Sequence, residues 1–120
     1  MRVSKNELNI SLKREIIRTF IQTIDDLKNF KEKQTFFESF FNNNELETYA
    51  KRLSIFYWLK KKKSYQNIKN NLKVSSATIA NLEKEIDTDG IKLALKKMEA
   101  EEWANKWSEK IKNVKRTKLF

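Results

Sequence analysis

The chain has 120 residues, no cysteine and no histidine, and its 26 lysines and arginines against 16 aspartates and glutamates give a formal charge of +10 at pH 7. Without cysteine the chain has no disulfide and no thiolate site, and without histidine it lacks the commonest metal ligand and general base. We therefore expect that the protein is not an enzyme, and that it has no catalytic residue, no metal and no cofactor. No apolar run approaches the ~18 residues of a membrane span and the N-terminus lacks a secretory core, so we expect a cytoplasmic protein with no membrane partner.

The composition favours helices throughout. Proline is absent and Gly90 is the single glycine. No stretch shows the alternation of apolar and polar residues that is typical of a strand. We therefore predict an all-α fold of about six helices in one domain, residues 1–120, whose apolar share supports a modest core.

The N-terminal part predicts one long helix. Ser4 and Glu7 have the spacing of a capping box, so the helix is expected to begin soon after residue 4 and to run to about Lys31. Helical spacing gives it a broad apolar face: Leu12, Ile16, Ile17, Phe20, Ile21, Ile24, Leu27 and Phe30. Such a helix is ~30 Å long, more than a small domain needs, which suggests a partner. The alternative is a helix folded over its own bundle.

The middle of the chain predicts a central helix. A polar break is expected before 34–41, QTFFESFF, whose four phenylalanines indicate a core or an interface. Asn42 and Glu45 then form a capping box. The helix that follows has an apolar face at helical spacing: Leu46, Tyr49, Leu53, Phe56 and Leu59. It ends in four consecutive lysines at 60–63.

Residues 64–86, SYQNIKNNLKVSSATIANLEKEI, predict a helix-turn-helix. In the first helix, Tyr65, Ile68 and Leu72 share one face, and Ser64 is placed to cap it. The turn is expected at 73–75. Two amphipathic helices joined by a tight turn also occur in helical proteins that bind no DNA.

The second helix of this motif has the features of a base-reading helix. Ser75 or Ser76 is placed to cap it, and its apolar face consists of Ile79, Leu82 and Ile86. Small or polar residues face away from that stripe: Ser76, Ala77, Thr78, Asn81 and Lys84. Such residues at the start of a helix allow close approach to the major groove.

These positions define a candidate DNA interface. Expected at base edges are Ser76, Ala77, Thr78 and Asn81, the last being suited to adenine. Expected at phosphates are Ser64, Gln66, Lys69, Lys73, Lys60, Lys61, Lys62 and Lys63. Ser75 and Lys84 complete the set. For the four lysines at 60–63, a solvated loop is the alternative interpretation.

The charge is unevenly spread along the chain. Residues 45–74 contain eight basic against two acidic residues, whereas 75–90 contain one against four. Because acid repels phosphate, we expect the N-terminal turn of the second motif helix to point toward DNA and its acidic end to point away. A genome-wide bias toward lysine is an alternative explanation for part of the positive charge.

The C-terminal part predicts a turn at 87–90 and an extra helix over 91–114. One face carries Ile91, Ala94, Leu95 and Met98, and the roughly opposite face carries Trp103, Trp107, Ile111 and Val114. We expect one face to pack on the chain's own core and the other on a second subunit. The alternative is a bend near 99–102.

From Asn42 onward the sequence resembles the Trp repressor superfamily, in particular its Trp-repressor-like (YerC/YecD-like) branch. The most specific matches are SSATI at 75–79, which follows SYxxI at 64–68, and GxKxAL at 90–95. The resemblance implies a helix-turn-helix fold whose N-terminal helices interlock two subunits into a dimer. It also implies a transcriptional regulator that binds double-stranded DNA.

Several positions depart from the family pattern. Lys62 and Lys73 stand where the family usually has glycine. Of the two arginines that sandwich the indole of L-tryptophan in that family, Arg52 matches one and Asn81 replaces the other. We therefore predict that L-tryptophan is not a corepressor of this protein.

The sequence thus predicts a homodimeric, sequence-specific DNA-binding regulator that acts as a repressor at two half-sites. One alternative is a protein interaction module that keeps the helix-turn-helix as a scaffold and binds through the acidic segment 83–89 or the aromatic tail. The other is a basic protein that binds nucleic acid without sequence preference.

Overall fold

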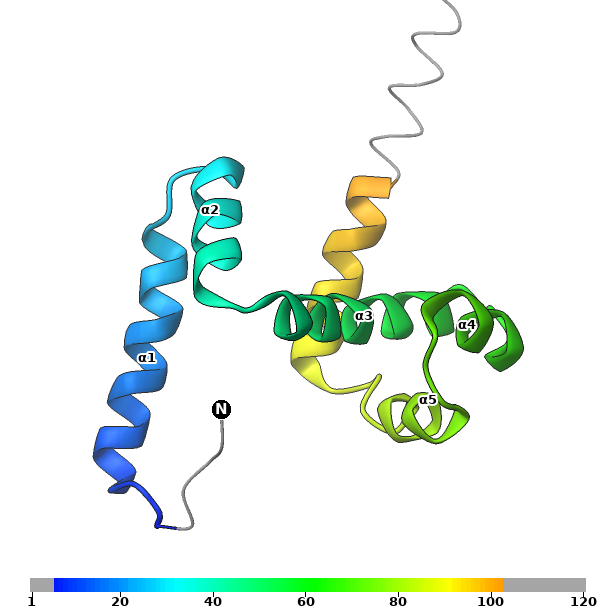
Figure 1. The fold of residues 1–120 in the computed structure, drawn as a ribbon, viewed down its shortest axis with the longest axis horizontal. Helices are drawn as coiled ribbons and strands as arrows, with labels where there is room; N and C mark the ends of the chain where they lie inside the picture. The colour runs from blue at the N-terminus through cyan, green and yellow to red at the C-terminus, as the bar shows by residue number, and fades with distance from the viewer. Residues whose placement is uncertain (1–5, 103–120) are drawn as a thin grey trace, which may run out of the picture. The chain divides into compact units, whose positions relative to one another are not determined.

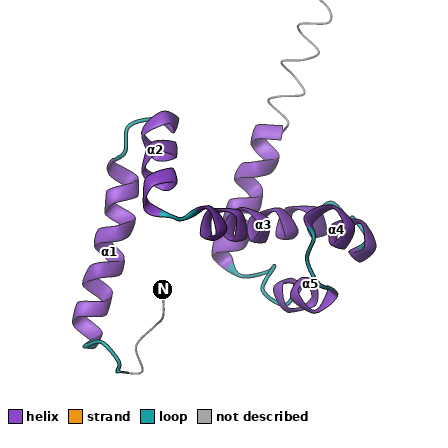
Figure 2. Ribbon diagram, in the orientation of Figure 1, coloured by secondary structure: helices purple, strands orange, loops and turns teal. Residues whose placement is uncertain are grey.

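The computed structural model describes residues 6–102, and over that range it contains six helices and no strand (Figures 1 and 2). The prediction of an all-α fold is confirmed. By their internal contacts the residues form two compact units, Met1–Leu46 and Glu47–Phe120.

In the first unit, α1 (Ile10–Asp26) and α2 (Phe30–Phe40) lie side by side and antiparallel (Figure 1). Phenylalanine rings join them. The ring of Phe20 lies 6.4 Å from that of Phe36 and 5.5 Å from that of Phe40, measured between centroids. Neither helix has a fully buried residue. The unit is therefore held together by a half-exposed aromatic cluster rather than by a closed core.

The start of α1 differs from the sequence prediction. Residues 6–9 are not helical, and Asn9 is the cap: its Oδ1 accepts hydrogen bonds from the backbone N–H groups of Ser11 at 2.9 Å and Leu12 at 3.3 Å. An asparagine oxygen at this position satisfies amides that have no partner inside the helix. The predicted start soon after residue 4 is wrong, and Ser4 itself lies outside the described residues.

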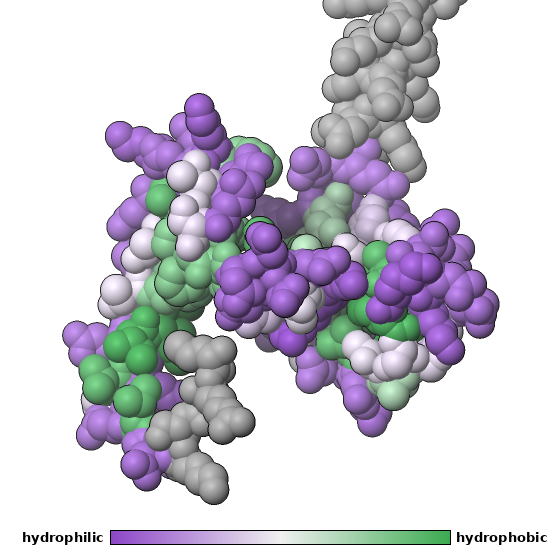
Figure 3. Space-filling view, viewed as in Figure 1, coloured by the Kyte–Doolittle hydropathy of each residue, from purple (hydrophilic) through white to green (hydrophobic). Residues whose placement is uncertain are grey.

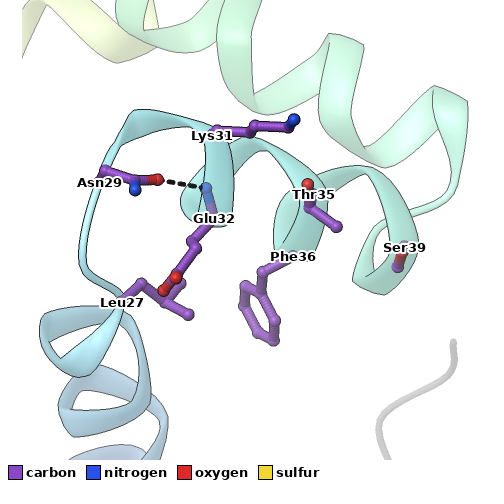
Figure 4. Close-up of a pocket in the computed structure, with 7 residues that line it drawn as sticks. All are labelled: Leu27, Asn29, Lys31, Glu32, Thr35, Phe36 and Ser39. Carbon is purple, nitrogen blue, oxygen red and sulfur yellow. Dashed lines mark hydrogen bonds between the residues drawn. The ribbon is translucent and has the colours of Figure 1, made fainter.

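The predicted single helix to about Lys31 is also wrong, because a second cap interrupts it. Asn29 Oδ1 accepts from the backbone N–H of Glu32 at 2.9 Å (Figure 4). In return, Glu32 Oε1 accepts from the backbone N–H of Lys28 at 2.9 Å. This reciprocal arrangement starts a new helix at Phe30, so the polar break lies at 27–29 rather than just before residue 34.

The central helix, α3 (Asn43–Lys60), begins as predicted. The backbone N–H of Glu45 donates to Asn42 Oδ1 at 2.8 Å, and the backbone N–H of Asn42 donates to Glu45 Oε1 at 3.0 Å. Both hydrogen bonds of the expected capping box are therefore present, and they fix where the helix starts.

The second unit is built on α3, α4 (Tyr65–Leu72), α5 (Ser76–Glu83) and a helix described over 89–102. Its core cluster consists of Ile55, Leu59, Ile68 and Ile79. Packed against them are Trp58, Tyr65, Leu72, Val74, Leu82 and Ile86. Both helices of the predicted helix-turn-helix therefore contribute a side chain to the same core as α3.

The apolar face predicted for α3 is only partly buried. Phe56 and Leu59 are buried, and so is Ile55, which the predicted face did not include. In contrast, Tyr49 is 46% exposed and Leu53 is 39% exposed. The buried side chains come from the C-terminal half of the helix, where the core cluster lies.

The second motif helix ends earlier than predicted, and the last helix begins earlier. α5 ends at Glu83, so Ile86 lies in the following turn at 84–88, although it still packs on the core. The last helix begins at residue 89, where the backbone N–H of Lys92 donates to the carbonyl oxygen of Thr88 at 2.9 Å. Gly90 is therefore helical and not part of a turn. Residues of the predicted second face lie outside the described residues: Trp103, Trp107, Ile111 and Val114.

That helix packs through the first of its two predicted faces. Leu95 is 1% exposed, and Ile91, Ala94 and Met98 are partly buried. On the other side Leu93 is 58% exposed. The prediction that one face of the last helix covers the chain's own core is confirmed.

Two lysines occupy left-handed turns on either side of α4. Lys62 has φ 63° and Lys73 has φ 57°. These are the two positions at which the resembled family usually has glycine, and in this chain the left-handed conformation is kept with a side chain present. A non-glycine residue in that conformation is strained, because its Cβ approaches the following carbonyl oxygen.

Replacing Lys73 by glycine is expected to raise the free energy of unfolding by about 1 kcal/mol, because relief of left-handed strain outweighs the entropy that glycine adds to the unfolded chain. Urea denaturation without DNA measures this change. The control is Lys69→Gly inside α4, which is expected to lower the same free energy by about 1 kcal/mol. A loss of stability in both variants contradicts the prediction.

Candidate nucleic-acid interface

The two motif helices begin at serine caps. Ser64 Oγ accepts from the backbone N–H of Asn67 at 3.1 Å, and Ser75 Oγ accepts from that of Thr78 at 3.1 Å. The hydroxyls of Ser75 and Thr78 are also 2.9 Å apart. Of the two caps that the sequence allowed for α5, Ser75 is the one used, so the side chain of Ser76 is not needed for capping.

The outer face of α5 is open to solvent. Ile79 is fully buried, and this fixes how the helix is rotated about its axis. The residues predicted to face away are exposed: Ser76, Ala77, Thr78, Asn81 and Lys84. Their orientation is as expected, and their contact with bases stays a prediction.

Exposed polar and basic side chains also surround α4. Gln66 lies on its first turn and donates from Nε2 to Asn70 Oδ1 at 3.0 Å. Lys69 lies on the last turn, and Lys63 and Lys73 lie just outside the helix. Across residues 6–102, these three lysines take part in no ion pair. Their charge is therefore available to an anionic partner.

Lys60 and Lys61 differ from the other predicted phosphate contacts, because both are held by the last helix. Lys60 Nζ lies 3.6 Å from Glu99 Oε1, and Lys61 Nζ lies 3.2 Å from Glu102 Oε2. The Lys61 ammonium also lies 5.4 Å from the centre of the Tyr57 ring. These ion pairs direct the two lysines toward the helix at 89–102, and no pattern in the sequence indicates them.

Glu83, at the end of α5, contacts Tyr65 of the other motif helix. Burial raises the pKa of the Tyr65 hydroxyl, and a hydrogen bond with Glu83 and the negative charge of that carboxylate raise it further. Tyr65 starts α4 and Glu83 ends α5. The pair therefore joins the two helices, and the phenol stays protonated at neutral pH.

The two positions that correspond to the indole clamp do not form one in this chain. The guanidinium of Arg52 lies 5.7 Å from the ring centre of Tyr49, on the same helix. Asn81 is exposed on α5 and carries no charge. These two positions therefore supply one cation, whereas the resembled family has two. That L-tryptophan is not a corepressor stays a prediction.

The part of the chain that the structure describes holds neither a cluster of metal-ligating side chains nor a membrane-spanning helix. Within residues 6–102, no group of three or more acidic side chains is placed to hold a metal ion. Over the same range, no helix combines the length and the apolar character needed to cross a membrane.

Comparison with protein families matches residues 15–99 to the family described as Trp repressor protein. The matched range begins within α1 and ends within the last helix, so it contains the whole helix-turn-helix and most of the first unit. No curated protein and no solved structure matches the chain.

Proposed function

This chain belongs to the Trp repressor family of helix-turn-helix, DNA-binding regulators, and from that premise we propose that it is a repressor that binds DNA as a homodimer. The observation that carries the proposal is the second motif helix, α5, whose small and polar N-terminal side chains are exposed while Ile79 anchors the opposite face in the core. Two such helices in a dimer would meet two half-sites about one helical turn apart.

Base recognition is proposed for residues 77–81 of α5. Ala77 leaves room for the backbone to approach the groove, and Thr78 offers a methyl group and a hydroxyl to base edges. Asn81 lies one turn further on, and its amide can bind adenine through two hydrogen bonds. The acidic residues begin only at Glu83, so the end of the helix that carries these three residues has no carboxylate to repel phosphate.

Phosphate contacts are proposed around α4. Its N-terminus, capped by Ser64, presents backbone N–H groups and the positive end of the helix dipole. Lys69 and Lys73 add charge at its other end. Because Lys60 and Lys61 already pair with acids at 3.6 Å and 3.2 Å, we give them a smaller share of the phosphate binding than Lys69 and Lys73.

A homodimer is proposed because the first unit leaves a wide apolar face uncovered. Ile10 is 70% exposed, Ile21 is 61% exposed and Phe30 is 80% exposed. Figure 3 shows hydrophobic side chains spread over the surface of this unit. Contiguous apolar surface of this kind marks an interaction site. In the resembled family the N-terminal helices interlock between two subunits, and a second copy of this chain would cover the same face.

Selection of bound duplexes from a random pool, in about physiological salt, tests the proposal. We expect an enriched motif with two related halves. Two results would favour the alternative functions instead. Binding to every duplex that disappears as salt rises indicates charge-driven binding, and absence of binding indicates a protein interaction module.

Replacing Asn81 by alanine is expected to relax the preference at one position of each half-site, with a loss of about 1–3 kcal/mol on the preferred base. Lys69→Gln is the matched control for a phosphate contact. It should weaken all sequences alike and lower the slope of log affinity against log salt by about 1. Titration of the selected duplex and of single-base variants measures both. An unchanged preference in Asn81→Ala rules out this docking of α5.

A further inference from the structure

A hollow of about 620 Å³ lies in the second unit, between the end of α3, the end of α5 with its turn, and the last helix. Its apolar lining comes from Leu59, Ile86 and Leu95, which also belong to the buried or half-buried part of this unit. Its charged lining comes from Lys60, Lys62, Lys92, Lys96, Glu83 and Asp87. The volume is that of a site for a small molecule.

The charges around this pocket do not cancel. Across residues 6–102, Lys62, Lys92 and Lys96 form no ion pair. The lining also carries two acids, Asp87 and Glu83, and the second of these forms a hydrogen bond with the Tyr65 hydroxyl. Three lysines without an ion pair therefore line a concave, partly apolar surface together with two acids, so the lining keeps a net positive charge and the complementary ligand is an anion.

The walls of the pocket are fixed by specific contacts. The Lys60–Glu99 and Lys61–Glu102 ion pairs join the end of α3 to the last helix. Lys62 lies in a left-handed turn, with φ 63°, where glycine would be unstrained. Strained residues of this kind often occur at functional sites, so the strained Lys62 in the pocket lining indicates a role in ligand binding.

We propose that this pocket binds a small polyanion that carries two or more phosphate or carboxylate groups. Lys62, Lys92 and Lys96 bind the anionic groups, and the half-buried Ile86 contacts the body of the ligand, above the buried Leu59 and Leu95. Neither Arg52 nor Asn81 lines the pocket, so it is separate from the position of the indole clamp. The site does not depend on DNA binding, and its test is independent of the proposed function.

The test uses inorganic pyrophosphate and citrate as probes, at ionic strength held constant with sodium chloride. Isothermal titration calorimetry measures affinity, and methyl NMR shifts of Leu59, Ile86 and Leu95 report the location. We expect saturable binding with shifts at those methyl groups. A tighter pyrophosphate complex identifies a phosphate ligand, and a tighter citrate complex identifies a carboxylate ligand.

Two double variants separate this pocket from the general positive charge of the chain. Lys92→Gln with Lys96→Gln removes two lining charges and is expected to weaken the probe at least 10-fold. Lys33→Gln with Lys97→Gln removes two exposed charges that do not line the pocket, and is expected to change affinity less than 2-fold. Equal losses in the two variants overturn the proposal, and so does the absence of saturable binding by both probes.

Discussion

Replacing Ile79 by alanine is expected to lower the free energy of unfolding by about 2–5 kcal/mol. Ile79 is 0% exposed and packs with Ile55, Leu59 and Ile68 in the core of the second unit. Truncation removes buried methyl groups and leaves a cavity that the surrounding helices fill only in part. Because small domains are stable by roughly 5–15 kcal/mol, the loss is a large share of the total.

Urea denaturation of the whole chain measures this effect, and Leu93→Ala is the matched control. Leu93 has a similar volume but is 58% exposed on the last helix, so its truncation is expected to cost less than about 1 kcal/mol. The Ile79 variant should also bind DNA more weakly, because Ile79 anchors α5 in the core and so fixes which side chains of that helix are exposed. Equal effects in the two variants would contradict the assignment of Ile79 to the core.

Local signals in the sequence were sufficient to predict the helix-turn-helix. Each cap lies about one helical turn before the buried residue of its own helix, Ser64 before Ile68 and Ser75 before Ile79. Their effects act through backbone N–H groups two or three residues away and through one helix face. The caps and the apolar face can therefore be identified from nearby residues, whereas the partners of that face, Ile55 and Leu59, come from α3.

The break between α1 and α2 is also encoded locally, although the apolar periodicity predicts one continuous helix. The apolar pattern continues through Leu27 and Phe30, and this periodicity hid the cap at Asn29 and its partner Glu32. The spacing is that of a capping box, with asparagine in place of serine or threonine. Here the hydrogen bonds at the cap outweighed helical periodicity.

Contacts between distant parts of the chain were not predictable from one sequence. The Lys60–Glu99 and Lys61–Glu102 ion pairs join residues about 40 positions apart, and the lysine-lined pocket depends on the same packing. No periodicity within either segment indicates its partner. The four lysines at 60–63 therefore looked equivalent in sequence, whereas the structure divides them between ion pairs, a left-handed turn and an exposed position.

The left-handed lysines connect stability with the proposed function. Lys73 is strained at φ 57° and is also a proposed phosphate contact. Lys73→Gly should therefore unfold at a higher urea concentration and bind DNA more weakly. The relief of strain changes the folding equilibrium, and the loss of the positive charge changes the DNA-binding equilibrium. This opposition is typical of residues whose strain is retained at functional sites.

Replacing Ile21 by glutamate is expected to dissociate the proposed homodimer and to weaken operator binding on the order of 100-fold or more, because the two half-sites are then bound by separate molecules. Ile21 is 61% exposed in the single chain, so the new charge does not enter the chain's own core. In a dimer that covers α1, the same charge would be buried without a partner, which is strongly unfavourable.

Gln22→Glu is the matched control, since it adds the same charge one residue away on the polar side of α1, where Gln22 Nε2 donates to Asp26 Oδ1 at 3.0 Å. Sedimentation velocity is expected to give a dimer for the wild type and Gln22→Glu, and a monomer for Ile21→Glu. Circular dichroism should give similar helix content for all three. If Ile21→Glu sediments as the wild-type dimer does, the second copy does not cover this face of α1, and the interface must be sought elsewhere on the chain.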